Sequence, residues 1–93
     1  MKIIIVGCGK VGFTLAEQLN SENHDITLID SDGPLLQSVT ETLDVMGVVG
    51  NGAISQVQIE AGIEEADLLI ATTNSDEVNM LCCLIAKKAG NCH

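Results

Sequence analysis

Aromatic residues are almost absent from this sequence of 93 residues, which holds one Phe (Phe13) and no Trp or Tyr. Because 46% of the residues are nonetheless apolar, the core must be built from aliphatic side chains. Ile, Leu, Val and Ala are typical of helices packed on a buried parallel sheet. The length suits one domain or part of one.

Positive charge is also scarce. Four lysines (Lys2, Lys10, Lys87 and Lys88) stand against thirteen acidic residues, Arg is absent, and the formal net charge is −9. This balance argues against nucleic acid and against an acidic membrane surface as partners, because both bind basic faces. An anionic ligand would have to be held mainly by backbone N–H groups and a helix N-terminus.

Signals for export, membrane insertion and disulfide bonding are missing too. Segment 1–6 is too short for the apolar region of a signal peptide, and no apolar run approaches the ~20 residues that span a bilayer. The four cysteines lack the spacing of a disulfide framework, so we expect reduced thiols in a cytosolic protein. Adjacent helical residues point about 100° apart, so Cys82 and Cys83 are not expected to form a metal site with Cys92 and His93.

Strand and helix patterns alternate four times along the chain. Strands are predicted over 2–6, 25–30, 45–49 and 67–73, and helices over 10–22, from 34, over 54–61 and from 75. This alternation predicts a Rossmann-like, doubly wound α/β fold with a parallel sheet, as one domain over residues 1–93. The chain ends where a fifth strand would be due, so we expect a sheet truncated after the fourth βα unit, with its fourth strand at an edge or an interface.

Helical spacing predicts which residues each helix buries. The expected buried positions are Val11, Leu15, Ala16 and Leu19 in the first helix, Leu35, Leu36, Val39 and Leu43 in the second, and Val78, Leu81, Cys82, Ile85, Ala86 and Ala89 in the last. Gly62 is expected to end the third helix. Asn74 with Glu77 resembles a capping box at the start of the last helix.

The segment IIIVGCGKVG, residues 3–12, places three glycines directly after the first predicted strand. Residues 7–12 fit G-x-G-x-x-G between a strand and a helix, the context in which this pattern indicates a dinucleotide site. Gly7 would permit the tight turn, Gly9 the approach of a pyrophosphate to the backbone, and Gly12 close packing of helix on strand. A turn without a ligand would explain only one or two of these glycines.

Asp30 closes the second predicted strand. That is the position for a carboxylate that accepts both hydroxyls of an adenine ribose. The same carboxylate would repel a 2′-phosphate, and no Arg is present to receive one, so NAD(H) is favoured over NADP(H). Adenosine phosphates share this ribose and remain alternatives. Asp32, beside Gly33 and Pro34, is assigned to the same site, with a helix cap as an equally weighted interpretation.

Two further strand ends carry small or polar residues. The turn GNGA (50–53) follows the third strand and would leave room for an adenine, with Asn51 offering its amide. Its alternative is an ordinary Asn-Gly turn. Thr72 and Thr73 follow the fourth strand. Because the first and fourth strands should flank the crevice, these threonines are expected to meet the phosphates or the second ribose, with strand-end capping as the alternative.

Three other side chains are weaker candidates. Lys10 would neutralise a phosphate, although a solvated lysine in the first helical turn is as good an interpretation. Cys8 faces the glycine loop and would be reactive at a helix N-terminus, but a small filler residue is favoured. His24 lies in a turn and is interpreted as solvated.

The segments GCGKVG, DITLIDSD, VVGNGA and EAGIEEADLLIATTNSDEVNMLCCLIAKKAG together resemble the TrkA family, the peripheral nucleotide-binding subunits of Trk potassium uptake systems. They also resemble the related RCK or KTN domains, which regulate potassium channel conductance. The resemblance covers essentially all 93 residues. The stretch 62–90 is much more specific than the glycine loop, which many dehydrogenases share.

The resemblance implies a cytoplasmic regulator, peripheral to the inner face of the plasma membrane, and not an enzyme. Such domains bind NAD(H) or adenine nucleotides (ATP, ADP or AMP), assemble as dimers or rings under a membrane-embedded potassium transporter or channel, and control ion flow. By position the ligand residues would be Gly7, Gly9, Lys10, Val11, Asp30, Ser31, Asn51, Gly52, Ala53, Thr72 and Thr73, with Glu77 and Asn79 near the phosphates. Asn51 stands where Asp is common in the family.

The main alternative is the cofactor domain of an NAD-dependent dehydrogenase whose catalytic domain lies elsewhere. Such an enzyme needs a proton donor or acceptor near the nicotinamide, usually His, Lys or Tyr. The sequence has no Tyr, and His24 and His93 are predicted to lie far from the crevice. A methyltransferase is the third interpretation, because it too uses a glycine loop and an acid after the second strand.

Overall fold

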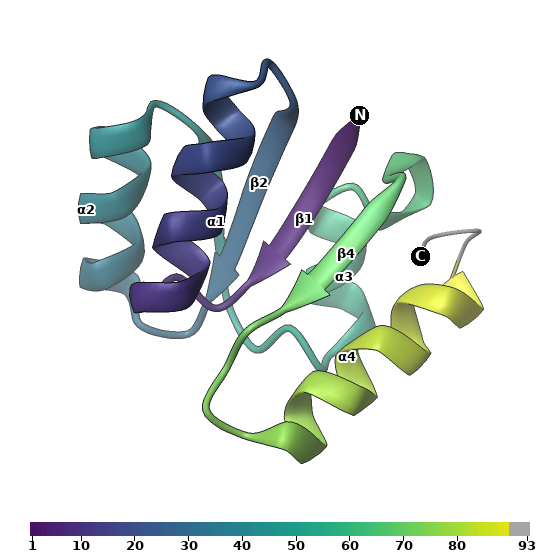
Figure 1. Ribbon diagram of the computed structural model, residues 1–93. Coiled ribbons are helices and arrows are strands. Elements are labelled where there is room, and N and C mark those ends of the chain that lie inside the picture. The colour runs from purple at the N-terminus through teal and green to yellow at the C-terminus, as the bar shows by residue number, and fades with distance from the viewer. Residues whose placement is uncertain (90–93) are drawn as a thin grey trace.

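The computed structural model describes residues 1–89, and its helices and strands alternate as predicted (Figure 1). The strands are β1 (Lys2–Val6), β2 (Asp25–Asp30), β3 (Met46–Val49) and β4 (Leu68–Ala71). The α-helices are α1 (Lys10–Ser21), α2 (Gly33–Leu43), α3 (Ser55–Glu60) and α4 (Asp76–Ala89), with a short 3-10 helix, η1 (Ile63–Glu65), before β4. The third and fourth strands are shorter than expected.

The four strands form one parallel sheet in the order β3-β2-β1-β4. Val6 of β1 pairs with Ile29 on one side and with Ala71 on the other, so the carboxyl ends of the strands lie at one edge of the sheet. Strand order reverses between β1 and β4, the position at which a crevice is expected, and residues that end or follow both strands line the cleft described below. Among residues 1–89, β4 is an edge strand, as expected.

Two aliphatic cores cover the two faces of the sheet. Alternate residues of β1 point to opposite faces, so Ile3 and Ile5 join one core while Ile4 and Val6 join the other. Helices α1 and α2 cover the first core, and α3, η1 and α4 cover the second (Figure 1). Aliphatic burial on both faces confirms the interpretation of the missing aromatics as a sign of a buried parallel sheet.

Four residues predicted to be buried on helix faces are exposed. Val11 is 62% exposed because it lies in the first turn of α1, above the end of the sheet. Leu81 is 47% exposed, and Ala89 is exposed as well, because α4 buries a narrow stripe of small side chains, Cys82 and Ala86. Leu35 is also exposed and turns toward the strand ends. Within residues 1–89, no helix has the length and apolar character that crossing a membrane requires.

The helix ends follow local chemistry. Gly62 has a positive φ of 89°, which favours glycine and ends α3 as predicted. The prediction of Asn74 as the cap of α4 was wrong by one residue, because Ser75 Oγ accepts the hydrogen bond from the Val78 amide at 3.1 Å. Glu77 Oε2 accepts a hydrogen bond from Ser75 Oγ at 3.1 Å.

Candidate functional site

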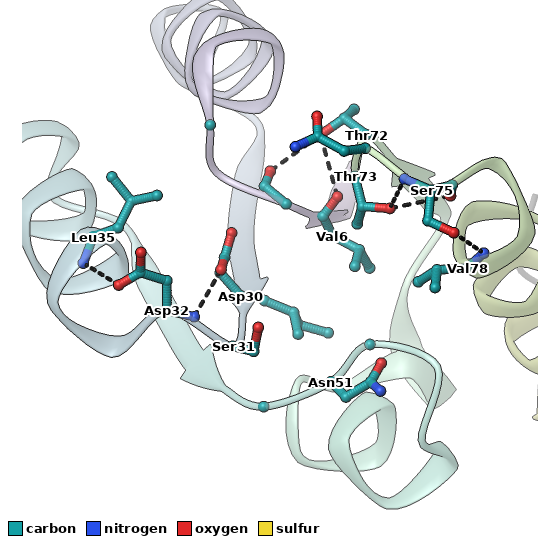
Figure 2. Close-up of a pocket in the computed structure, with 16 residues that line it drawn as sticks. Val6, Asp30, Ser31, Asp32, Leu35, Asn51, Thr72, Thr73, Ser75 and Val78 are labelled. Atoms are coloured by element: carbon teal, nitrogen blue, oxygen red, sulfur yellow. Dashed lines mark hydrogen bonds between the residues drawn. The ribbon is translucent and has the colours of Figure 1, made fainter.

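A cleft of about 590 Å³ opens at the carboxyl ends of the strands. Figure 2 shows Asp30 and Asp32 on one side, Thr73, Ser75 and Val78 on the other, and Asn51 below them. Four connections meet here: the glycine loop, the β2–α2 loop, the turn after β3, and the β4–α4 connection. Its lining residues are Val6, Gly7, Gly9, Ile29, Asp30, Ser31, Asp32, Leu35, Gly50, Asn51, Gly52, Thr72, Thr73, Asn74, Ser75 and Val78.

The glycine loop is packed tightly at two of its three glycines. Gly7 has a φ of 99°, a left-handed conformation that favours glycine. A Cβ at Gly12 would overlap the carbonyl oxygen of Gly7, so a side chain there would push α1 away from β1. A Cβ at Gly9 would meet no atom within 4 Å, because this residue faces open space in the cleft. The first and last glycines therefore serve the fold, and the middle one leaves room above the backbone.

The amides that open α1 have no acceptor among the described residues. No carbonyl or side chain of residues 1–89 accepts a hydrogen bond from the backbone N–H of Gly9, Lys10 or Val11. The first N–H groups of any α-helix lack a partner within the helix, and together they carry about half a positive charge. Gly9 caps α1 without any side-chain hydrogen bond. This end of the helix can therefore bind an anion through its backbone.

The Asp30 carboxylate is held in place by two backbone amides. Its Oδ2 accepts a hydrogen bond from the Cys8 amide at 2.9 Å, and its Oδ1 accepts one from the Asp32 amide at 2.8 Å. Each carboxylate oxygen can accept more than one hydrogen bond, so both remain able to accept hydroxyl donors. The side chain lines the cleft beside the glycine loop, where the sequence placed it.

Cys8 does not face the cleft, contrary to the expectation of a loop-facing thiol. Its side chain is 1% exposed and belongs to the core between the sheet and α1. Burial and then the negative charge of Asp30 raise the pKa of Cys8 to about 12, from an ordinary thiol value of 9.0. A thiol held neutral in this way is a poor nucleophile, so Cys8 fills space, as favoured from the sequence, and contributes its amide to Asp30.

Asp32 serves as the cap of α2, the second of its two predicted roles. Its Oδ1 accepts a hydrogen bond from the Leu35 amide at 3.1 Å, and Pro34 lies in the first turn of the helix. Asp32 also lines the cleft, together with Ser31 and Leu35. The cap directs the chain from Asp30 around the rim of the cleft.

The turn after β3 approaches the end of β1 closely. A Cβ at Gly52 would meet the Val6 side chain at 2.5 Å, so this position has no space for a larger residue. Asn51 Oδ1 accepts a hydrogen bond from the Ala53 amide at 2.9 Å, which closes a local turn. The carbonyl of Gly52 accepts a hydrogen bond at 2.8 Å from Gln58, a fully buried side chain whose Oε1 has no partner among residues 1–89.

The β4–α4 connection is joined to the glycine loop by Thr72. Its hydroxyl lies 3.2 Å from the carbonyl oxygens of both Val6 and Gly7, so it donates into the glycine loop rather than toward the cleft. Thr73 instead bonds to Asn79, whose Oδ1 accepts from the Thr73 amide at 2.9 Å and from its hydroxyl at 2.6 Å. Both threonines line the cleft, but their hydroxyls are committed to protein acceptors.

The structure brings most of the predicted site residues together. Nine of them line the cleft: Gly7, Gly9, Asp30, Ser31, Asp32, Asn51, Gly52, Thr72 and Thr73. Seven others do not line it: Cys8, Lys10, Val11, Gly12, Ala53, Glu77 and Asn79. The Lys10 side chain is exposed, and Glu77 lies at the outer surface of α4. Their assignment to a ligand stays a prediction.

Seven lining residues were not among the predicted ligand residues: Val6, Ile29, Leu35, Gly50, Asn74, Ser75 and Val78. Val6 and Ile29 close buried strands, and a rule that includes the last residue of each strand would have found them. Ser75 could have been found as a helix cap.

His24 lies just before β2, at the opposite edge of the sheet from the cleft. Cys92 and His93, considered with Cys82 and Cys83 as metal ligands, fall outside the described residues.

The parallel sheet, the glycine loop and the acidic residue on the neighbouring strand define a Rossmann-like α/β domain. The family model of the TrkA-N domain matches residues 3–93. The chain therefore belongs to the TrkA-N domain family.

Curated relatives carry the same family name. The chain is 47% identical over 91 residues to "Trk system potassium uptake protein TrkA" of Azorhizobium caulinodans, covering 98% of this chain and 20% of the relative. It is 51% identical over 86 residues to the protein of that name from Halomonas elongata, covering 92% of this chain and 19% of the relative. The chain thus spans about a fifth of the length of these two relatives.

Solved structures share the fold. The TrkA-N domain of the Escherichia coli inner membrane protein ybaL superposes with a TM-score of 0.89 at 24% identity, covering 97% of this chain and 66% of that one. The C-terminal domain of Kef from Shewanella denitrificans, in its AMP-bound form, has a TM-score of 0.83 at 17% identity, covering 99% of this chain and 57% of that one. At these identities the likeness shows the fold alone.

Proposed function

We propose that this chain is a regulatory nucleotide-binding domain of a potassium uptake system, and that its cleft binds NAD(H) or an adenine nucleotide. One observation carries the proposal. The Asp30 carboxylate is fixed beside the glycine loop by the Cys8 and Asp32 amides, while the amides of Gly9, Lys10 and Val11 have no acceptor among residues 1–89. A ribose hydroxyl pair and a phosphate are the groups that complement this arrangement.

The chemistry of the cleft favours NAD(H) over NADP(H). Asp30 and Asp32 both line the side where the adenine ribose would bind, and a 2′-phosphate there would face two carboxylates with no Arg in the chain to offset them. Adenosine phosphates, including AMP, ADP and ATP, satisfy the same two subsites. The AMP bound to the Kef domain, which has the same fold, is consistent with such a ligand.

The regulatory assignment rests on the relatives. Those described above are named potassium uptake proteins, and the chain matches part of their length. Within residues 1–89 no His or Tyr reaches the cleft to serve as a proton donor, which does not favour the dehydrogenase interpretation. The domain would act on a membrane-embedded potassium transporter subunit from the cytoplasmic side, without catalysis of its own.

Self-association belongs to the same proposal. Met80, Leu81 and Leu84 on α4 are exposed apolar residues, and β4 is an edge strand of the described sheet. Exposed apolar surface and open strand edges are features through which subunits assemble. A dimer or ring would let nucleotide binding in several domains act on one transporter.

The Asp30→Ala variant tests the nucleotide site. Removing the carboxylate should weaken NADH, NAD, ATP and ADP by roughly 1–3 kcal/mol, the size of a lost charge-assisted hydrogen bond. Isothermal titration calorimetry of the parent and the variant measures the change. The matched control is Asp25→Ala, which removes an exposed carboxylate from the opposite end of the same strand. Equal affinity of the parent and Asp30→Ala for every ligand would rule out this role of Asp30.

A further inference from the structure

We propose that Asn79 is a positioning residue of the nucleotide cleft. It holds Thr73 in place, and through Thr73 it shapes the side of the cleft that receives the half of a dinucleotide beyond the adenosine. The inference rests on the nucleotide-binding function proposed above and deepens it. Asn79 itself does not line the cleft, whereas Thr73, Asn74 and Ser75 do.

The Asn79 carboxamide pairs with the backbone of Thr73 as a neighbouring strand would. Its Oδ1 accepts from the Thr73 amide at 2.9 Å, and its Nδ2 donates to the Thr73 carbonyl at 3.1 Å. Thr73 lies two residues beyond the end of β4 (Leu68–Ala71), where the sheet no longer supplies partners. Backbone polar groups withdrawn from water need a partner, and an amide side chain supplies a donor and an acceptor at once.

The hydrogen bonds continue from Thr73 into the start of α4. The Thr73 hydroxyl donates to Asn79 Oδ1 at 2.6 Å and accepts from the Ser75 amide at 3.2 Å. Ser75 Oγ in turn accepts from the Val78 amide. Asn79 therefore anchors a connected set of hydrogen bonds through which the cleft-lining segment 73–75 keeps its shape.

The opposite side of the cleft is held independently of Asn79. Asp30 is fixed by the amides of Cys8 and Asp32, and none of these groups bonds to Thr73 or Asn79. A ligand that uses only the Asp30 side and the glycine loop, such as AMP, should therefore be insensitive to Asn79. A dinucleotide that extends past the glycine loop toward the β4–α4 connection should be sensitive to it.

Two substitutions separate this role from simple stabilisation. Asn79→Ala removes all three bonds to Thr73. Asn79→Asp has nearly the same shape and keeps both acceptor contacts, but it places a carboxylate oxygen against the Thr73 carbonyl. The matched control is Asn20→Asp, which makes the same chemical change where Nδ2 of Asn20 bonds to the Leu43 carbonyl at 2.9 Å, between the far ends of α1 and α2.

Calorimetric titration of the 93-residue chain with AMP and with NADH gives the decisive readout. We expect both Asn79 variants to weaken NADH by about tenfold or more, the size that one or two lost hydrogen bonds produce, and to leave AMP within about twofold. Asn20→Asp should change neither. A shift of the Thr73 amide resonance in the ligand-free Asn79 variants, measured by NMR, should accompany the loss.

Other results would overturn the inference. Equal weakening of AMP and NADH, unchanged NADH affinity, or a parent that binds AMP but not NADH would each remove the assignment of Asn79 to the second half of a dinucleotide. A parent that binds neither ligand would instead overturn the proposed function, and this inference with it. Should Asn79→Ala fail to fold, the isosteric Asn79→Asp decides the question.

Discussion

The glycine-loop side of the cleft and the side formed by the β4–α4 connection meet at Thr72, yet their shapes have different origins. On the first side, the backbone sets the shape of the cleft. Gly7 and Gly12 allow close backbone packing, and the Cys8 and Asp32 amides orient Asp30. On the second side, the side chains of Thr73, Ser75 and Asn79 bond to one another and to the backbone.

The two sides of the cleft should therefore tolerate amino-acid substitution differently. The backbone is closely packed at Gly7 and Gly12, where a single added methyl group would meet main-chain atoms. These two positions therefore tolerate almost no substitution. A side-chain network can lose one member and relax around the gap, so each substitution costs less. Substitutions at Gly7 and Gly12 should therefore act mainly through stability, and substitutions in the β4–α4 network mainly through ligand affinity.

The largest effect is expected at Gly12. A Cβ there would overlap the Gly7 carbonyl oxygen and crowd the Thr72 hydroxyl, so Gly12→Ala must shift α1 away from the sheet. We expect the free energy of unfolding to fall by about 3 kcal/mol. Urea unfolding followed by circular dichroism measures this loss.

Gly9→Ala is the matched control for that prediction. Gly9 has no neighbour that a Cβ would touch and an ordinary φ of −70°, so Gly9→Ala should cost no more than about 1 kcal/mol, the usual cost of Ala at a helix N-cap. Nucleotide affinity should fall nonetheless, because the methyl group would stand where a phosphate is proposed to bind. Similar losses of stability in the two variants would show that the two glycines do not have separate roles.

A smaller effect is expected at Thr72, where the two sides join. Thr72→Val keeps the shape of the side chain but removes the hydroxyl that bonds to the Val6 and Gly7 carbonyls. The loss of stability should be about 1 kcal/mol, and Thr72→Ser should recover most of it. Thr14→Val is the control, because the Thr14 hydroxyl bonds to the Lys10 carbonyl on an exposed helix face. If both Val variants behave alike in thermal unfolding, Thr72 does not join the two sides.

A further effect, confined to alkaline pH, is expected from the Cys8 thiol. Burial and the Asp30 charge raise the pKa of Cys8 to about 12, so the folded state holds this proton more tightly than the unfolded state does. The resulting stability is present below pH 9, the ordinary thiol value, and is lost as pH rises from 9.0 toward about 12. Between pH 8 and 10, the free energy of unfolding measured with urea should fall more steeply for the parent than for Cys8→Ser. If the free energy of unfolding of both proteins falls with pH at the same rate, the pKa of Cys8 is not raised.

Local patterns in the sequence predicted three features of the structure. These are the α/β alternation, the bounds of strands β1 and β2, and the position of Asp30. Buried aliphatic runs, helical spacing and a glycine motif are properties of consecutive residues. The same local patterns misplaced Val11 and Leu35, since spacing identifies the apolar stripe of a helix but not where the sheet beneath it ends, and misplaced Leu81, since spacing does not give the width of that stripe.

Composition and spacing alone thus determined an aliphatic, doubly wound sheet with a glycine loop and an acid on the neighbouring strand. Only the tertiary structure decided what each polar group bonds to. The Cys8 amide reaches Asp30, the Thr72 hydroxyl turns to the glycine loop, and Cys8 itself is buried. These contacts join residues 22 or 65 positions apart, and such pairings form only when the strands have settled side by side in the order β3-β2-β1-β4.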